Sequence, residues 1–192
     1  MGIDQDLVLP ALPSDTVVLE HSLSAQFGTW CHALLQHSLQ VYVLGNRVVL
    51  PSTDDAFACL PVDFPQGVLH ANELRLVAES VVSLAHGFLS STFFADLVDA
   101  NPVAMESEVG FSFRMQVGTN ERAVVNGSID LLVRYADAVC VIDFKTDTLR
   151  MPHLHGEQLA MYRKAAAHLY GLPVRSALCY LRQIGSEVWI TG

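Results

Sequence analysis

Residues 127–146, with the sequence GSIDLLVRYADAVCVIDFKT, carry the strongest structural signal in this chain. Two runs rich in Val, Ile and Leu flank a short break at 135–138. Apolar, β-branched runs separated by a tight turn are typical of neighbouring antiparallel strands. The stretch therefore predicts a β-hairpin.

The register of this hairpin places two acids opposite each other. With the turn centred within residues 135–138, Asp130 faces Asp143 and Ser128 faces Lys145. Directly opposed side chains have Cβ atoms about 4.5–5.5 Å apart. Because alternate strand residues share a face, Lys145 lies on the same face as Asp143. The opposite face is expected to be apolar and to consist of Ile129, Leu131, Val133, Cys140, Ile142 and Phe144.

Two facing carboxylates destabilise a sheet unless a proton, a cation or a metal ion compensates their charge. Lys145 supplies one positive charge, and a hard divalent cation such as Mg²⁺ suits the remaining oxygen ligands. A metal ion held beside a lysine can activate water and stabilise the charge of a phosphodiester under attack. The alternative is that Asp130 and Asp143 are solvent-facing acids with Lys145 as a surface neighbour.

The rest of the chain predicts a single domain over residues 21–192, preceded by an arm or linker over 1–20 with a strand-like piece at 16–19. Helices are expected over 24–40, 71–88, 92–99 and 156–170, the last of which ends at Gly171. Strands are expected over 106–117, 124–134, 138–145, 174–182 and 186–190, and residues 45–68 are rich in loop-forming residues. This order indicates an α/β fold whose mixed sheet begins as an antiparallel meander and is flanked by helices.

Composition excludes several classes of protein. The chain has 192 residues, 51% of them hydrophobic and 16% charged, with a net charge of −9. These values exclude a disordered chain and argue against broad, nonspecific coating of nucleic acid. We expect neither a membrane span nor a signal peptide, and therefore a cytoplasmic protein.

Two kinds of cofactor are not expected. The four cysteines form no CxxC pair, which disfavours a zinc ribbon or an iron–sulfur cluster and favours free thiols. The only lysines, Lys145 and Lys164, are not part of a GxxxxGK[ST] loop, so no ATP site of that type is expected in this chain.

Five motifs occur in order along the chain. The hairpin contributes GxIDLLV and VIDFKTD, the next helix contributes Gln158-x-x-x-Tyr162, and GTWCH at 28–32 and EVGF at 108–111 lie upstream. Together they resemble the nuclease domain of RecB-type helicase–nucleases, which belong to the PD-(D/E)xK nuclease superfamily. GTWCH is similar to the G-T-x-x-H helix of that family, and EVGF is similar to its E-x-P-F strand, with Gly110 in place of proline. The resemblance covers residues 28 to about 181 and implies a restriction-endonuclease-like core.

The resemblance also implies a metal site. Its ligands would be His32, Asp130, Asp143 and the backbone carbonyl of Phe144, and the ion would be Mg²⁺ with Mn²⁺ as a possible substitute. Glu108 would be an outer acid or would position its strand.

The same resemblance assigns catalytic roles. Asp130 and Asp143 would act together with Lys145, which would orient or help deprotonate the attacking water. Gln158 and Tyr162, at i and i+4 on one helical face, would line the site and contact substrate or steady the lysine. Without the motif, an ordinary capping and packing pair is the alternative for these two residues.

The implied function is a Mg²⁺-dependent DNA nuclease domain of exonuclease type in a helicase–nuclease that acts in recombination and repair. Its expected partners are DNA, in single-stranded form, and a helicase domain or subunit in the same complex. The alternative is a non-catalytic, nuclease-like module that binds DNA or helicase subunits.

Several basic positions stay open. His37 is interpreted as an ordinary surface or core histidine. His153 and His155 are interpreted as solvated loop residues, with substrate contacts as the alternative. The candidates for phosphate contacts are Arg114, Arg122 and Arg134, and Arg134 is expected on the catalytic face.

Overall fold

The computed structural model describes residues 14–45, 47–64, 67, 69–117, 121–183 and 188–190. Four helices come first: α1 (Ser14–Gly45), α2 (Thr53–Ala58), α3 (Ala71–Leu89) and α4 (Thr92–Asp99). Three strands follow: β1 (Ala104–Val117), β2 (Glu121–Arg134) and β3 (Val139–Lys145). The chain continues with the 3₁₀ turn η2 (Pro152–His155), α5 (Gly156–Tyr170), β4 (Val174–Tyr180), η3 (Leu181–Gln183) and β5 (Val188–Ile190).

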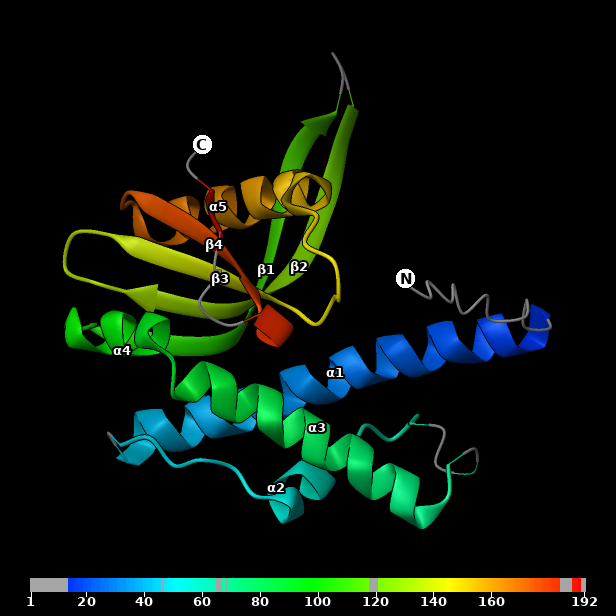
Figure 1. Cartoon of the computed structure of the whole chain (residues 1–192). Coiled ribbons are helices and arrows are strands. Elements are labelled where there is room, and N and C mark those ends of the chain that lie inside the picture. Colours follow the sequence, from blue (N-terminus) through cyan, green and yellow to red (C-terminus); the bar gives the residue numbers. More distant parts are fainter. Residues whose placement is uncertain are drawn as a thin grey trace, which may run out of the picture.

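The strands form one mixed sheet in the order β1-β2-β3-β4-β5. The pairs β1–β2 and β2–β3 are antiparallel, β4 is parallel to β3, and β5 is antiparallel to β4. Helix α5 makes the crossover between the parallel strands and covers one face, while α1, α3 and α4 lie on the other side (Figure 1). The predicted α/β fold, with a sheet begun by an antiparallel meander and flanked by helices, is confirmed.

Both faces of the sheet are covered, so there are two hydrophobic cores. The larger one joins α1, α3 and α4 to the face that carries Leu131, Ile142 and Phe144. The smaller one lies under α5 and contains Leu132 and Val141. Burial on both faces explains why β3 is an almost continuous apolar run instead of an alternating one.

The predicted hairpin register is confirmed over four pairs, from Arg134↔Val139 to Leu131↔Ile142. It stops there, so the expected ladder pairs of Asp130 with Asp143 and of Ser128 with Lys145 do not form. The reason is that the Phe144 amide donates its hydrogen bond to Asp130 Oδ2, at 2.7 Å, so a side chain bridges the two strands.

The strand irregularity at Asp130 also changes the face of its neighbour. Ile129, predicted to share a face with Leu131, packs in the core under α5. The β1–β2 ladder has its own gap at this position, since Ser107↔Leu131 and Val109↔Ile129 pair but no pair joins Glu108 to Asp130. Strand alternation therefore fails where Glu108 and Asp130 do not pair in the β1–β2 ladder.

Three predicted elements need correction. Residues 16–19 belong to α1 and not to a strand, because no glycine or proline interrupts residues 14–27. The stretch 45–68 contains the short helix α2, stabilised by a capping box between Ser52 and Asp55. Residues 181–183 form η3 instead of extending the preceding strand. The expected end of α5 is confirmed, since Gly171 adopts a left-handed φ of 63°.

All four cysteines are free, as expected, and three of them are buried: Cys31, Cys140 and Cys179. No single described helix is long and apolar enough to cross a membrane, although α3 and α4 together, bent by 46°, would meet both criteria.

The two glycines of the β1–β2 ribbon differ in the space around them. A Cβ atom on Gly127 would lie 2.5 Å from Cζ of Phe111, its cross-strand partner, whereas one on Gly110 would meet nothing within 4 Å. We expect Gly127→Ala to displace the Phe111 ring and to lower the free energy of unfolding by about 1–3 kcal/mol. Gly110→Ala is the matched control and should change it by less than about 0.5 kcal/mol. Urea denaturation measures both, and equal losses would contradict the packing described.

Candidate metal and catalytic centre

Helix α1 carries His32 and is fixed tightly beneath the sheet. Trp30 is fully buried, and its indole N–H donates to the Ala56 carbonyl at 2.6 Å. Gly28 lies against the loop after β3, because a Cβ atom there would be 3.1 Å from Thr146 Oγ1. This close approach explains the glycine four residues before the histidine, since a larger residue would push α1 away from β3.

The break in the β1–β2 ladder directs Glu108 and Asp130 toward this helix. Glu108 has a φ of 53°, a left-handed conformation that costs a non-glycine residue about 1 kcal/mol or more. Its Oε2 accepts a hydrogen bond from Ser128 Oγ at 2.8 Å. The backbone strain is thus located at Glu108, whose carboxylate points toward His32 and Asp130 and is fixed by Ser128.

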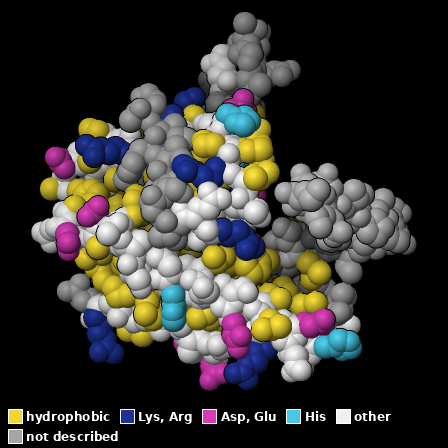
Figure 2. All heavy atoms as spheres, viewed as in Figure 1, with side chains coloured by type: hydrophobic (Ala, Val, Ile, Leu, Met, Phe, Trp, Pro, Cys, Tyr) yellow, Lys and Arg dark blue, Asp and Glu magenta, His cyan; other side chains and the backbone are white. Residues whose placement is uncertain are grey.

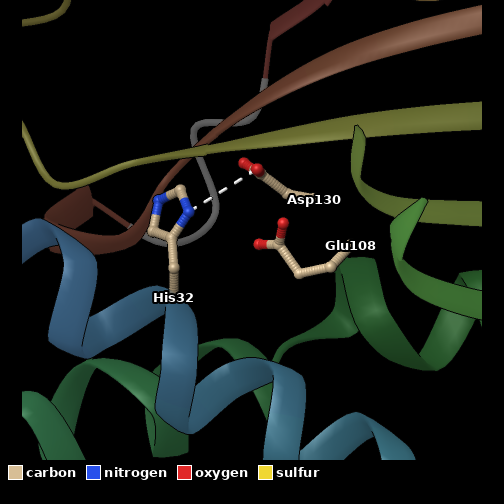
Figure 3. Close-up of side chains that lie close together, drawn as sticks. All are labelled: His32, Glu108 and Asp130. Carbon is tan, nitrogen blue, oxygen red and sulfur yellow. Dashed lines mark ion pairs between the residues drawn. The ribbon is translucent and has the colours of Figure 1, made fainter. Parts of the chain in front are cut away.

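His32, Glu108 and Asp130 point toward one another from α1, β1 and β2 (Figure 3). One potential ligand atom of each lies within 4.8 Å of the others. His32 Nδ1 is 3.5 Å from Asp130 Oδ1, and its Nε2 is 3.2 Å from the Phe144 carbonyl oxygen. His32 and Glu108 line a pocket of about 660 Å³ together with Phe144, Lys145 and residues of α1 and the loop after β3.

This donor set fits a hard divalent cation. Octahedral Mg²⁺ binds oxygen ligands at about 2.1 Å, so its ligand atoms lie about 3–4 Å apart. The 4.8 Å limit observed here is close to that spacing. The two carboxylates are ligands that Mg²⁺ and Mn²⁺ prefer, and the imidazole would add one nitrogen ligand. Glu108, expected as an outer acid or as a residue that positions its strand, lies within the group of three possible ligands.

The charge of His32 is coupled to these acids. Burial by itself would lower the pKa of His32, but the hydrogen bond to Asp130 and the negative charges of Asp130, Asp143 and Glu108 together raise it. Both ring nitrogens face oxygen acceptors, which suits an imidazolium with a proton on each nitrogen. A metal ion would replace one of these protons.

Asp143 lies beside the group and not within it. Its side chain is almost completely buried, and Oδ2 is 2.8 Å from Lys145 Nζ. Burial, followed by the negative charge of Asp130, raises the pKa of Asp143 to about 6, although Lys145 opposes the shift. The structure therefore places Asp143 close enough to interact with Asp130 but pairs it with the lysine.

A hydrogen-bonded chain fixes the lysine. Lys145 Nζ donates to Gln158 Oε1 at 3.1 Å, and Gln158 Nε2 donates to the Tyr162 hydroxyl at 2.7 Å. Burial, with Asp143 and Asp130 next, raises the pKa of Tyr162 to about 12, so its hydroxyl stays protonated. The predicted helical pair thus faces the lysine.

Arg182, which the sequence did not single out, braces the same region. Its Nε donates to the Thr146 carbonyl at 2.7 Å, and its guanidinium lies 4.8 Å from the centre of the Phe27 ring. One side chain therefore links η3 to α1 and to the residue after Lys145. A single arginine near the C-terminus gave no sequence signal for this role.

Comparisons with known proteins identify the family. A family model described as the PD-(D/E)XK nuclease superfamily matches residues 7–188. This chain belongs to the PD-(D/E)XK nuclease superfamily. The predicted resemblance to that superfamily is confirmed.

Two curated relatives are named as ATP-dependent helicase/nuclease subunits. The protein from Oceanobacillus iheyensis is 22% identical over 81% of this chain, and the one from Lactiplantibacillus plantarum is 24% identical over 93%. This chain spans only 13–14% of their length. Among solved structures, protein VC1899 from Vibrio cholerae has a TM-score of 0.34 and 14% identity over 86% of this chain and 48% of that one.

Other predicted positions of this nuclease domain lie away from the centre. Arg134 is on the expected face but four residues beyond Asp130, about 13 Å along β2, and its guanidinium lies 5.8 Å from the Tyr170 ring centre. The side chain of Arg122 is outside the described residues. Arg114 lines a separate groove.

The three open histidines differ in position. His37 and His153 are exposed, as expected. His155 lines the pocket, and burial and the charge of Lys145 lower its pKa.

The buried carboxyl of Asp143 gives a pH-dependent prediction. Its pKa is about 6 in the folded chain against an ordinary value of 3.8, so the unfolded chain loses this proton first as pH rises. Stability contributed by the protonated group is present below about pH 4 and is lost as pH rises through about 6. In EDTA, we expect Asp143→Asn to raise the free energy of unfolding by about 1–3 kcal/mol at pH 7.5 relative to the parent chain, and by much less near pH 4.

Urea denaturation at the two pH values measures this difference. Asp147→Asn, at an exposed acid of the same pocket, is the control and should change stability little at either pH. A gain for Asp143→Asn that is the same at both pH values would contradict the burial effect.

Proposed function

We propose that this domain is a metal-dependent deoxyribonuclease that hydrolyses phosphodiester bonds with Mg²⁺, or with Mn²⁺ as a substitute. The observation that carries the proposal is the convergence of possible ligand atoms of His32, Glu108 and Asp130, at the edge of a pocket that His32, Glu108 and Lys145 line. Membership of a nuclease superfamily supports the reaction class.

His32, Glu108 and Asp130, with the Phe144 carbonyl, would hold the ion, and Asp143 stays a proposed ligand because of its proximity to Asp130. Bound there, a divalent ion would lower the pKa of water and offset the charge of the phosphate.

Lys145 is positioned to act on the attacking water or on the phosphate. An ammonium group has three N–H donors, and Asp143 and Gln158 are the two neighbours that orient it. The remaining donor can orient water or contact a phosphate oxygen inside the pocket, which Lys145 lines. Gln158 is in turn fixed by Tyr162, so these two residues are proposed to position the catalytic lysine.

The biological setting is part of the proposal. The relatives are named as helicase/nuclease subunits, and this chain corresponds to about one seventh of their length. We therefore propose that the domain works with a helicase domain or subunit in the cytoplasm and cuts single-stranded DNA in an exonuclease mode during recombination and repair. A non-catalytic module that binds DNA or helicase subunits is the competing function.

Lys145→Ala and Asp130→Asn should each reduce cleavage of single-stranded DNA at least about a hundredfold, because the first removes the ammonium group beside the phosphate and the second removes the negative charge of a proposed metal ligand. Labelled oligonucleotides incubated with Mg²⁺, Mn²⁺ or EDTA provide the measurement, and EDTA should abolish cleavage. Arg75→Ala and Asp99→Asn change matching charges on α3 and α4 and should leave the rate unchanged.

Full cleavage by Lys145→Ala or by Asp130→Asn would refute the assigned roles. Tight DNA binding by the parent chain, with no cleavage in either metal, would favour the non-catalytic module.

A further inference from the structure

A second polar groove lies between β1 and α5, outside the pocket of the metal and catalytic centre. It has a volume of about 520 Å³. Its lining consists of Ser112, Phe113, Arg114 and Gln116 from β1 and of Lys164 and His168 from α5. The two α5 residues are four positions apart on the exposed side of the helix. The groove thus brings together side chains about fifty residues apart in the sequence.

The charge of this groove is opposite in sign to that of the chain. The net charge is −9, and Lys164 is one of only two lysines. No acid lines the groove, and no ion pair joins Arg114 or Lys164 to an acid within the described part of the chain. Figure 2 shows one face of the molecule, on which both acidic and basic side chains occur and no broad basic surface forms. Two unpaired cations with no acid between them are suited to an anionic ligand.

An aromatic ring stands beside these cations. Phe113 is half-buried and stacks on Phe111, with 5.8 Å between ring centres and 28° between planes. Phe111 in turn contacts Tyr162 edge-on at 5.7 Å, and Tyr162 belongs to the chain of hydrogen bonds that reaches Lys145. The groove is therefore connected to the catalytic centre by packed side chains.

Strand β1 also links the groove to the metal site. It carries Glu108 in the site and Arg114 in the groove, six residues further on, which corresponds to at most about 20 Å along an extended strand. A groove for single-stranded nucleic acid usually combines cations that contact the phosphate backbone with aromatic rings on which bases stack.

We propose that the groove lined by Arg114, Lys164 and His168 binds the phosphate backbone of the DNA strand at a distance from the bond that is cut. This inference rests on the proposed function, because it assigns a second contact to the same substrate. Arg114 and Lys164 supply the charge, His168 adds a hydrogen-bonding group, and Phe113 offers a ring to a base.

The test compares DNA binding with hydrolysis of a small substrate. Binding of a fluorescent oligothymidylate of about 30 nucleotides is measured by anisotropy in EDTA over a range of salt concentrations. Arg114→Ala and Lys164→Ala should each weaken binding about threefold to tenfold and lower the slope of log K against log salt by about 0.7. Hydrolysis of bis(p-nitrophenyl) phosphate, which is too small to span both sites, should be unchanged.

Arg75→Ala is the matched control. It removes one exposed cation from α3, on the other side of the sheet, and should leave the affinity and the salt slope unchanged. Equal binding by the parent chain and the two groove variants would overturn the proposal, as would an equal loss in Arg75→Ala or a parent chain that binds no oligonucleotide.

A different result would show that the proposed function itself is wrong. If Lys145→Ala still cuts DNA as the parent chain does, the catalytic assignment is wrong, whereas the effect of the groove variants on affinity in EDTA is unaffected. If Lys145→Ala is inactive and the groove variants bind normally, only the groove is wrong.

Discussion

The hydrogen bond from the Phe144 amide to the Asp130 carboxylate is the interaction on which the site depends. At 2.7 Å it replaces a backbone acceptor with a side chain and ends the β2–β3 ladder one residue before the two acids would face each other. Consequently the Phe144 carbonyl lies near His32, and Asp130 keeps its second oxygen for the imidazole. A continuous ladder would hold Asp130 against Asp143 and leave the acids without a common centre.

The buried charges and the backbone strain of this structure are concentrated around the same hydrogen bond. Asp143 is buried beside a second acid, Glu108 adopts a left-handed backbone, and His32 is drawn toward its charged form. The left-handed backbone of Glu108 and, without a bound cation, the buried charge of Asp143 oppose stability, whereas the interaction of His32 with the acids favours it. Two hydrophobic cores on either side of the sheet offset the cost. A ligand that binds only the folded chain returns part of this free energy, so metal binding and folding stability are thermodynamically linked at this centre.

Local sequence patterns predicted most of the fold but only part of the site. The hairpin register followed from strand alternation and turn length, and α4 and α5 followed from periodicity and stop signals. Strand alternation could not predict the break at Asp130. The prediction therefore placed Ile129 on the wrong face and paired Asp130 with Asp143. That break depends on a side-chain hydrogen bond, which residue spacing does not encode.

The remaining discrepancies have similar causes. Residues 45–68 were predicted as loop-forming because α2, which begins with the Ser52–Asp55 capping box, has only 6 residues and lies among prolines and acids. Glu108 lies among the possible ligands because its backbone is left-handed, and Arg182 contacts the loop after β3 although it is 36 residues away from Thr146 in the sequence. Residue spacing predicts neither feature.

The net charge of −9 constrains how the proposed substrate can reach this centre. A DNA strand is repelled by the chain as a whole, and screening at physiological salt limits that repulsion to about 8 Å. Attraction must therefore be local, from a bound metal ion, Lys145 and any cluster of cations without acids nearby. Such an arrangement gives weak long-range capture and strong short-range placement, which suits a domain that receives its strand from a partner.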